Sequence, residues 1–458
     1  MLLFIALLIP LSVTYGDDAR VDFAEQIQPL LAENCFACHG PDASHREAEL
    51  RLDEEAAVKK AVVVPGDPAA SELFTRIVSV DPDLQMPPAD SGKSLKPEDI
   101  RLIERWIAEG AKWSRHWAFV SPRKPEPPNV GGDWSRNAID RFVFQRMKEH
   151  GLHPSPEADR RTLLRRVYFD LIGLPPAPED LERFLADTSD DAYEKFVDEL
   201  LADPHYGERV AIDWLDAARY ADTNGYQNDF YRSMWPWRDW VIKALNDNLP
   251  YDQFILHQIA GDMLDSPTQD QLIATGFSRN HRMVTEAGSI DEEWEVENVV
   301  DRVETTSAAL LGLTMGCGRC HDHKYDPITQ TEFYEFFAFF NNVDEKGVYT
   351  ETRGNVPPLI QLPTPDDVAK LNEFDTRIQD LEQQLAKANA DASESKSENA
   401  AVNDLSQRLE AVRKERGDFD KSIQTTMIMR DRAEYRPTYL LKRGQYNLPD
   451  KSRELWPA

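Results

Sequence analysis

The sequence predicts a mainly α-helical protein with more than one domain. The chain has 458 residues, which exceeds what one compact core usually contains. Hydrophobic residues make up 41% of it, enough for well-filled cores. Apolar side chains recur at intervals of three and four positions in one segment after another, which is the spacing of amphipathic helices. We therefore predict helical domains joined by linkers.

The net charge of the protein limits which classes of molecule it is expected to bind. At pH 7 the formal charge is −29. Because an acidic surface repels the phosphate backbone, we expect no nucleic-acid partner. A basic protein, a cation or a neutral substrate is compatible with this charge. For the charge alone, a solubilising surface is the favoured interpretation.

Residues 1–16 predict a secretory signal peptide. An apolar run from Leu2 to Val13 ends in turn-forming residues, with Thr14 and Gly16 at the small-residue positions before a cleavage site. No Lys or Arg precedes the run, so the α-amino group must supply the positive charge. An uncut membrane anchor is the alternative, but the run is short for a bilayer span. We expect a periplasmic or otherwise exported protein that is not integral to the membrane after cleavage.

The cysteines predict the cofactor. All four lie in two C-x-x-C-H motifs, at positions 35–39 and 317–321. This motif attaches c-type haem. Helical positions three and four apart share one face, so two thiols can bond the haem vinyl groups while the following His reaches the iron. The sequence thus predicts two covalently bound haems, attached at Cys35, Cys38, Cys317 and Cys320, with His39 and His321 as iron ligands.

Three other uses of the cysteine pairs were weighed. A redox dithiol would need a βαβ context, which is missing around both motifs. One zinc ion could bind both pairs, but a zinc site does not require a His after each second Cys. Disulfides suit an exported protein, yet residues three apart in a helix bridge poorly.

Residues 17–115 resemble a small class I cytochrome c. An apolar stripe that includes Phe23, Ile27 and Leu31 leads into the first motif. Met86 lies in a Pro-flanked segment and is our candidate for the sixth iron ligand, with His45 as a weaker rival. A closing helix is expected from about residue 97 to 110, with an apolar face.

The chain as a whole resembles a known family. It is similar to the planctomycete-type cytochrome c domain that is followed by a large haem-containing domain of unknown function. The residues that carry this resemblance are the Cys35–His39 motif, Met86–Pro88 and the string LTMGCGRCHDHKYDP at 313–327. The resemblance covers nearly everything after residue 16 and implies exported haem proteins. It implies an architecture rather than a particular reaction.

A Pro-rich linker at 116–133 separates the first domain from a helical domain at 134–345. Within the second domain, residues 214–262 combine polar and aromatic side chains, as in pockets for sugar-like substrates. A helical core with buried tryptophans is an equal alternative, and a calcium loop at 222–226 is weaker because the pattern lacks its terminal Glu. The candidate substrate-binding residues are Asp222, Asn224, Tyr226, Asp229, Trp235 and Trp237.

A dense polar cluster follows the second haem motif. Its ionisable residues could orient an imidazole or exchange protons, and a solvated turn after the haem motif is the alternative. The candidate catalytic residues are Asp322, His323, Lys324 and Asp326. For the distal ligand of the second haem, the sequence offers four candidates and does not distinguish between them: His257, His281, Met283 and Met315.

The remaining chain predicts a connector at 346–365, an antiparallel helical hairpin at 366–421 and a C-terminal segment at 422–458. Two apolar seams with heptad spacing support the hairpin. In the family that the chain resembles, the last segment leads into a further large domain. We therefore expect a separate chain to supply that domain, or a truncated sequence.

Three functional hypotheses from different classes remain. The first is a dihaem oxidoreductase that acts on a carbohydrate-like substrate and passes electrons to a redox partner protein. The second is a pure electron-relay protein without substrate chemistry. A structural surface protein is a third. An open iron position at the second haem would favour the first hypothesis, and a filled one would favour the relay.

Overall fold

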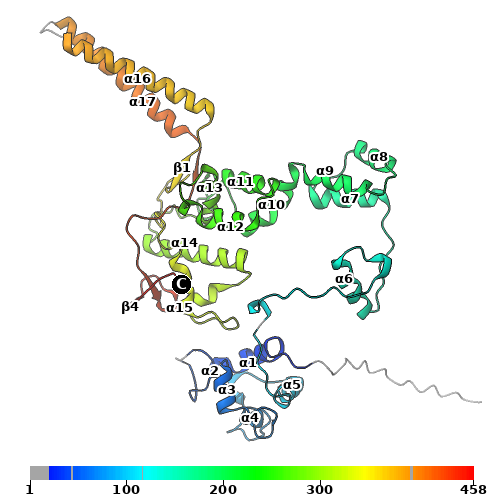
Figure 1. The fold of residues 1–458 in the computed structure, drawn as a ribbon. Helices are drawn as coiled ribbons and strands as arrows, with labels where there is room; N and C mark the ends of the chain where they lie inside the picture. Colours follow the sequence, from blue (N-terminus) through cyan, green and yellow to red (C-terminus); the bar gives the residue numbers. More distant parts are fainter. Residues whose placement is uncertain (1–19, 43–44, 116, 392–395, 458) are drawn as a thin grey trace, which may run out of the picture. The chain divides into compact units, whose positions relative to one another are not determined.

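Helices dominate the computed structural model, which describes residues 20–42, 45–115, 117–391 and 396–457. Figure 1 shows this helical character, and the predicted class is confirmed. The chain divides into two compact units. The first unit contains residues 1–155 and 320–330, and the second contains residues 156–319 and 331–458. The predicted signal peptide at 1–16 lies outside the described residues.

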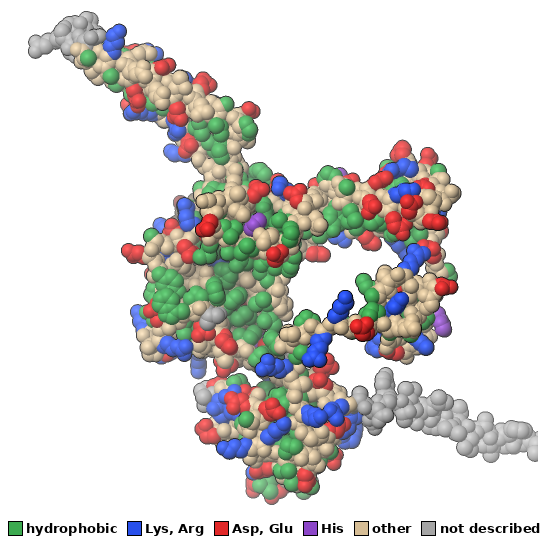
Figure 2. All heavy atoms as spheres, in the orientation of Figure 1, with side chains coloured by type: hydrophobic (Ala, Val, Ile, Leu, Met, Phe, Trp, Pro, Cys, Tyr) green, Lys and Arg blue, Asp and Glu red, His purple; other side chains and the backbone are tan. Residues whose placement is uncertain are grey.

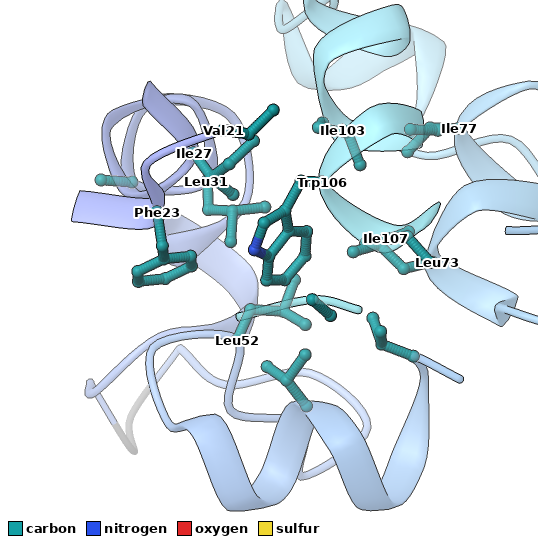
Figure 3. Close-up of a cluster of buried hydrophobic side chains, with 14 of the residues drawn as sticks. Val21, Phe23, Ile27, Leu31, Leu52, Leu73, Ile77, Ile103, Trp106 and Ile107 are labelled. Atoms are coloured by element: carbon teal, nitrogen blue, oxygen red, sulfur yellow. The ribbon is translucent and has the colours of Figure 1, made fainter. Parts of the chain in front are cut away.

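The first unit is built on short helices around one buried tryptophan. Trp106 lies at the centre of the cluster in Figure 3, and Trp113 stacks on Phe23 with ring centroids 3.7 Å apart. A π-helical turn at Phe23–Ile27 runs directly into the first helix. The helices are α1 (Gln28–Asn34), α2 (Phe36–His39), α3 (Glu55–Ala61), α4 (Glu72–Ile77), α5 (Pro97–Ala108) and α6 (Ala138–Glu149).

Helix α5 forms for local reasons that the sequence shows. Pro97 occupies its first turn, and the carboxylate of Asp99 accepts a hydrogen bond of 3.0 Å from the Lys96 amide. Ile103, Trp106 and Ile107 form its buried face. The closing helix predicted at 97–110 is therefore confirmed. By contrast, no residue of α6 is buried, although the apolar stripe there correctly predicted a helix.

Among its described residues, the second unit contains two helical cores besides the seam of the hairpin. Leu164, Phe184 and Phe196 meet in the first, and Trp237, Phe277 and Met283 lie in the second. Its first three helices are α7 (Arg160–Leu171), α8 (Pro178–Ala186) and α9 (Ala192–Leu201). The others are α10 (His205–Ala217), α11 (Trp235–Asn246), α12 (Tyr251–Ala260), α13 (Gln269–Ala274), α14 (Asp291–Thr306) and α15 (Gln330–Ala338).

The predicted helical hairpin is confirmed. Helices α16 (Pro365–Asp391) and α17 (Lys396–Ser422) lie side by side in Figure 1. Phe374, Leu381, Leu409 and Val412 form its seam. Acidic and basic side chains alternate over its surface in Figure 2. Strand β1 (Leu359–Gln361) pairs antiparallel with β2 (Thr425–Met427), so the two ends of the hairpin are joined at its base.

The C-terminal segment adds a second two-stranded sheet, in which β3 (Thr438–Leu441) pairs antiparallel with β4 (Pro449–Leu455). Within the described part of the chain, no helix is both long and apolar enough to cross a membrane.

Candidate functional site

The first haem motif lines a cavity in the first unit. The cavity has a volume of about 410 Å³. Cys35, Cys38 and His39 lie on its wall together with Met86 and Pro87. These residues come from segments almost fifty positions apart in the sequence, and the fold brings them to one apolar space. Leu50, Leu52, Val62, Leu73 and Ile77 supply much of the apolar lining.

His39 is oriented for a ligand on its outer nitrogen. Its Nδ1 lies 3.2 Å from the carbonyl oxygen of Glu47. A carbonyl only accepts, so Nδ1 carries the proton and donates it, which leaves the lone pair of Nε2 free in the neutral ring. The Glu47 amide donates in turn to the Cys38 carbonyl at 2.7 Å. Such a hydrogen bond to the inner nitrogen is typical of iron-ligating histidines.

Met86 is held on the cavity wall by its backbone. Its amide donates to the carbonyl of Arg76 at 3.1 Å, and Pro87 and Pro88 follow it on the same wall. The rival ligand His45 is exposed, pairs with Asp42 at 2.9 Å and is not among the lining residues. The placement agrees with Met86 as the sixth ligand, and this assignment stays a prediction.

The electrostatics of the cavity favour neutral sulfur. Burial, followed by the neighbouring Cys38, raises the pKa of the Cys35 thiol to about 12. A thiolate metal site would need the opposite shift, whereas a thioether carries no charge. Among the described residues, no three His, Cys, Asp or Glu side chains form a group that could hold a metal ion. The residues present therefore fit a covalently attached haem better than zinc.

The second motif has a different setting. Cys317 lies in a 3-10 turn at Met315–Arg319, and both Cys317 and Cys320 are exposed. The Nδ1 of His321 donates to the carbonyl of Asp322 at 2.7 Å, which again leaves Nε2 free. A helix leads toward this motif. It is α14, continued by a π-helical turn that ends at Gly312.

The polar residues after the second motif make local structural contacts. The Asp322 carboxylate accepts from the amide of Gln330 at 2.8 Å, where α15 begins. His323 is buried, and its Nδ1 accepts from the amide of Asp326 at 2.8 Å, which places its ring proton on Nε2. Lys324 lies over the Tyr325 ring. Because Asp322 and His323 organise the turn, the catalytic role of these residues stays a prediction without geometric support.

The predicted substrate residues do not gather around one pocket. Asp222 accepts from the amides of Met234 and Trp235 at 2.7 and 2.8 Å and so caps α11. Asp229 accepts from the Gly225 amide at 2.7 Å. Trp237 is fully buried in the core of the second unit, which corrects its assignment as a stacking surface.

The three other residues of that segment are placed differently. Asn224 is fully buried, and Trp235 is half-buried at the start of α11. Tyr226 packs against Trp294 with ring centroids 5.2 Å apart, and Arg282 lies within 6 Å of both rings. The carboxylates of Asp222 and Asp229 already accept backbone amides, which weakens the calcium alternative.

The most unusual group in the second unit is one that sequence reasoning missed. Glu345 is buried and pairs with Arg279 and with Arg302, the latter at 2.5 Å. His281 donates from Nδ1 to the Arg282 carbonyl at 2.8 Å and accepts from Arg302 at 3.1 Å through Nε2. We call Arg279, His281, Arg302 and Glu345 the buried ionic cluster.

Charge compensation explains how this cluster tolerates burial. Burial alone would raise the pKa of Glu345, but Arg302 and Arg279 hold it well below its usual range. Burial lowers the pKa of His281, so the ring is neutral. Both ring nitrogens of His281 are engaged, which removes it from the candidate distal ligands.

The other three candidate distal ligands have separate placements. Met283 lies in the second core, Met315 is buried, and His257 bonds to Gln271 at 3.3 Å. The distal ligand of the second haem thus stays open.

Two segments of the chain match models of known protein families. Residues 35–90 match the family model described as Planctomycete cytochrome C. Residues 138–345 match the model described as a protein of unknown function, DUF1549. Neither the curated proteins nor the solved structures contain a match. The first match makes the first unit a c-type cytochrome domain, a class that binds haem covalently and transfers electrons. The chain therefore joins a segment that matches the Planctomycete cytochrome C model to a segment that matches the DUF1549 model.

Proposed function

We propose that this chain is an exported dihaem c-type cytochrome that works in electron transfer. The observation that carries the proposal is the cavity of the first unit, where Cys35, Cys38 and His39 share an apolar space with Met86. The repeated C-x-x-C-H at 317–321 supports a second attachment site. Residues 1–16 support export.

The residues of the first cavity have distinct roles in this proposal. Cys35 and Cys38 would form the thioether links, His39 would bind iron through Nε2, and Met86 would supply a second iron ligand. When bound, haem supplies a one-electron iron couple. Arg76 and Lys93 are cations among the lining residues and would pair with the haem carboxylates. Arg76 also accepts the Met86 amide, so it links this wall to the ligand loop.

Met86 is tested by an isosteric replacement. Met86→Leu keeps the volume but removes the thioether, which stabilises reduced iron. We expect the reduction potential of the first haem to fall by on the order of 0.1 V, within the roughly 0.8 V range that axial ligands span. A redox titration measures this shift, and the sulfur-to-iron absorption band should disappear.

The matched control for this test is His45→Ala, which removes the rival ligand. His45 is exposed and is not among the residues of the cavity wall, so potential and spectrum should stay unchanged. If the two variants behave in the opposite way, Met86 is not the ligand.

Whether the protein is an enzyme or an electron relay depends on whether the iron of the second haem has an open coordination position. We propose that the second haem either has an open iron position and acts on an organic substrate, as an oxidoreductase would, or has a filled one and only relays electrons. The scattered placement of the predicted substrate residues favours the relay as the second candidate function. In a Cys35→Ala protein, carbon monoxide binding to the reduced remaining haem would support the oxidoreductase. A spectrum that does not respond would support the relay.

The proposal also includes export of the protein and a redox partner. A soluble redox protein would receive or supply the electrons. N-terminal sequencing of the protein recovered from the periplasm of an expression host tests export. A mature terminus at Asp17 is expected, and a retained Met1 would contradict cleavage.

A further inference from the structure

Another cavity lies in the second unit, away from the residues assigned to haem, and Glu345 of the buried ionic cluster lies on its wall. It has a volume of about 930 Å³. Two segments form it, residues 344–349 and residues 432–437, together with Pro357. Its lining residues are Asp344, Glu345, Lys346, Tyr349, Pro357, Arg432, Ala433, Glu434, Tyr435, Arg436 and Pro437. We call this space the C-terminal cleft.

Two guanidinium groups of the C-terminal cleft share one carboxylate oxygen. Arg432 and Arg436 both donate to the same Oε1 atom of Glu295, at 3.1 and 3.0 Å. The side chain of Arg436 is 19% exposed and that of Glu295 is 20% exposed, so this contact is largely shielded from water. One carboxylate thus serves two partly buried cations, which leaves positive charge without a matched partner.

The two arginines differ in how fully they are engaged. Arg432 also donates to the carbonyls of Val343 at 3.2 Å and Glu345 at 2.8 Å. For the guanidinium of Arg436, Glu295 is the one hydrogen-bond acceptor found among the described residues. Burial lowers the pKa of Arg436, as expected for a cation that is incompletely compensated. Arg436 therefore retains donors for a second acceptor.

The rest of the wall adds a further cation and a ring surface. Lys346 lies on the wall and is exposed. The Tyr349 hydroxyl accepts from the Lys346 amide at 3.0 Å and donates to the Pro357 carbonyl at 3.0 Å, so this side is held in place. Tyr435 is 40% exposed and stacks on Trp456 with ring centroids 5.1 Å apart and planes 10° apart. Tyr435 therefore places an aromatic ring, supported by Trp456, on the wall of the cleft.

The wall also carries acidic groups, which restrict the negative charge that a ligand of this cleft can have. Asp344 and Glu434 are exposed, whereas Glu345 is neutralised by Arg279 and Arg302. Exposed carboxylates are solvated and screened, while the shielded Arg436 is not. A ligand with one carboxylate would complete the contacts of Arg436, and a highly charged polyanion would meet the acidic rim.

We propose that the C-terminal cleft binds a small organic carboxylate with a ring body, as in a sugar acid. The carboxylate accepts from Arg436 and approaches Lys346, and the ring packs on Tyr435. This site requires no haem, so a failure of the haem proposal would leave it intact.

Calorimetric titration of the full chain with three probes tests this proposal. Glucuronate carries both features, glucose carries the ring alone, and acetate carries the carboxylate alone. We expect saturable binding of glucuronate and at least tenfold weaker binding of the other two. Arg436→Gln should weaken glucuronate binding about tenfold or more, because a charge-assisted bidentate contact is lost.

Two further variants keep the test decisive. Lys346→Gln removes an exposed cation of the wall, and it should weaken glucuronate binding several-fold even if Arg436→Gln disturbs folding. Arg453→Gln removes an exposed cation elsewhere in the same unit and should have no effect. Equal affinity for glucuronate and glucose, no saturable glucuronate binding, or an equal loss in Arg453→Gln would overturn the proposal.

Discussion

Replacing Cys35 by alanine should leave a protein with one covalently attached haem instead of two. Cys317→Ala should do the same at the other motif. Each change removes one of the two thioether links and the geometry that places the following His on the iron. The pyridine haemochrome spectrum, together with the intact mass of protein from a host with c-type haem maturation, measures the haem count. The double variant should carry none.

The two single variants serve as controls for each other. If only Cys35→Ala lowers the haem count, the chain is a monohaem cytochrome and the exposed motif at 317–321 has another role. An absence of covalent haem in the unmodified, soluble protein would remove the basis of the proposed function. The haem count of Cys317→Ala is the more informative result, because the cysteines of the second motif are exposed whereas Cys35 lines an apolar cavity.

Replacing Glu345 by glutamine should destabilise the second unit by about 3–5 kcal/mol. This change leaves Arg279 and Arg302 buried without their shared carboxylate, and an uncompensated buried charge is costly. Urea unfolding, followed by the fluorescence of the buried Trp237 and its neighbours, measures the loss. The control is Glu382→Gln in the hairpin, which breaks the exposed pair with Arg413 and should cost no more than about 1 kcal/mol.

The same cluster predicts how stability depends on pH. The pKa of His281 is lowered by burial, and the pKa of Glu345 is held low by its two arginines. In both cases the unfolded chain binds a proton more readily than the folded chain, so stability rises with pH across each window. The unmodified protein should therefore lose stability as pH falls below 6.5, the ordinary value for His, and further below 4.5, the ordinary value for Glu. In Glu345→Gln the second loss should shrink. A second loss of undiminished size would show that other carboxylates cause it.

Local sequence patterns were sufficient for the helices and for the first haem motif. The apolar face of α5 and the seam of the hairpin depend on residues three or four positions apart, and the same spacing sets the face of a helix. The motif at Cys35–His39 is likewise local. Met86 lies on the same cavity wall as the motif. Predicting this required a second inference, that a Pro-flanked loop can bring a ligand to the haem on the side opposite His39.

The substrate prediction shows where composition misleads. Polar and aromatic residues are dense between residues 214 and 262, but Asp222 caps a helix and Trp237 fills a core. Both structural uses need the same residue types as a sugar site, so composition cannot separate them. A signal for the buried ionic cluster did exist in α14. Asn298, Arg302 and Thr306 recur four residues apart on its buried side, and such a polar stripe indicates buried partners.

By itself, the sequence determined the helical class, the hairpin, the family and the two C-x-x-C-H motifs, because each depends on neighbours along the chain. Only the tertiary structure showed that Arg279, His281 and Arg302 meet Glu345, and that residues 344–349 and 432–437 enclose one cleft. These groups come from segments that no periodicity connects. Their contacts depend on how helices and loops pack, and in the buried cluster desolvation makes close pairing of the charges necessary.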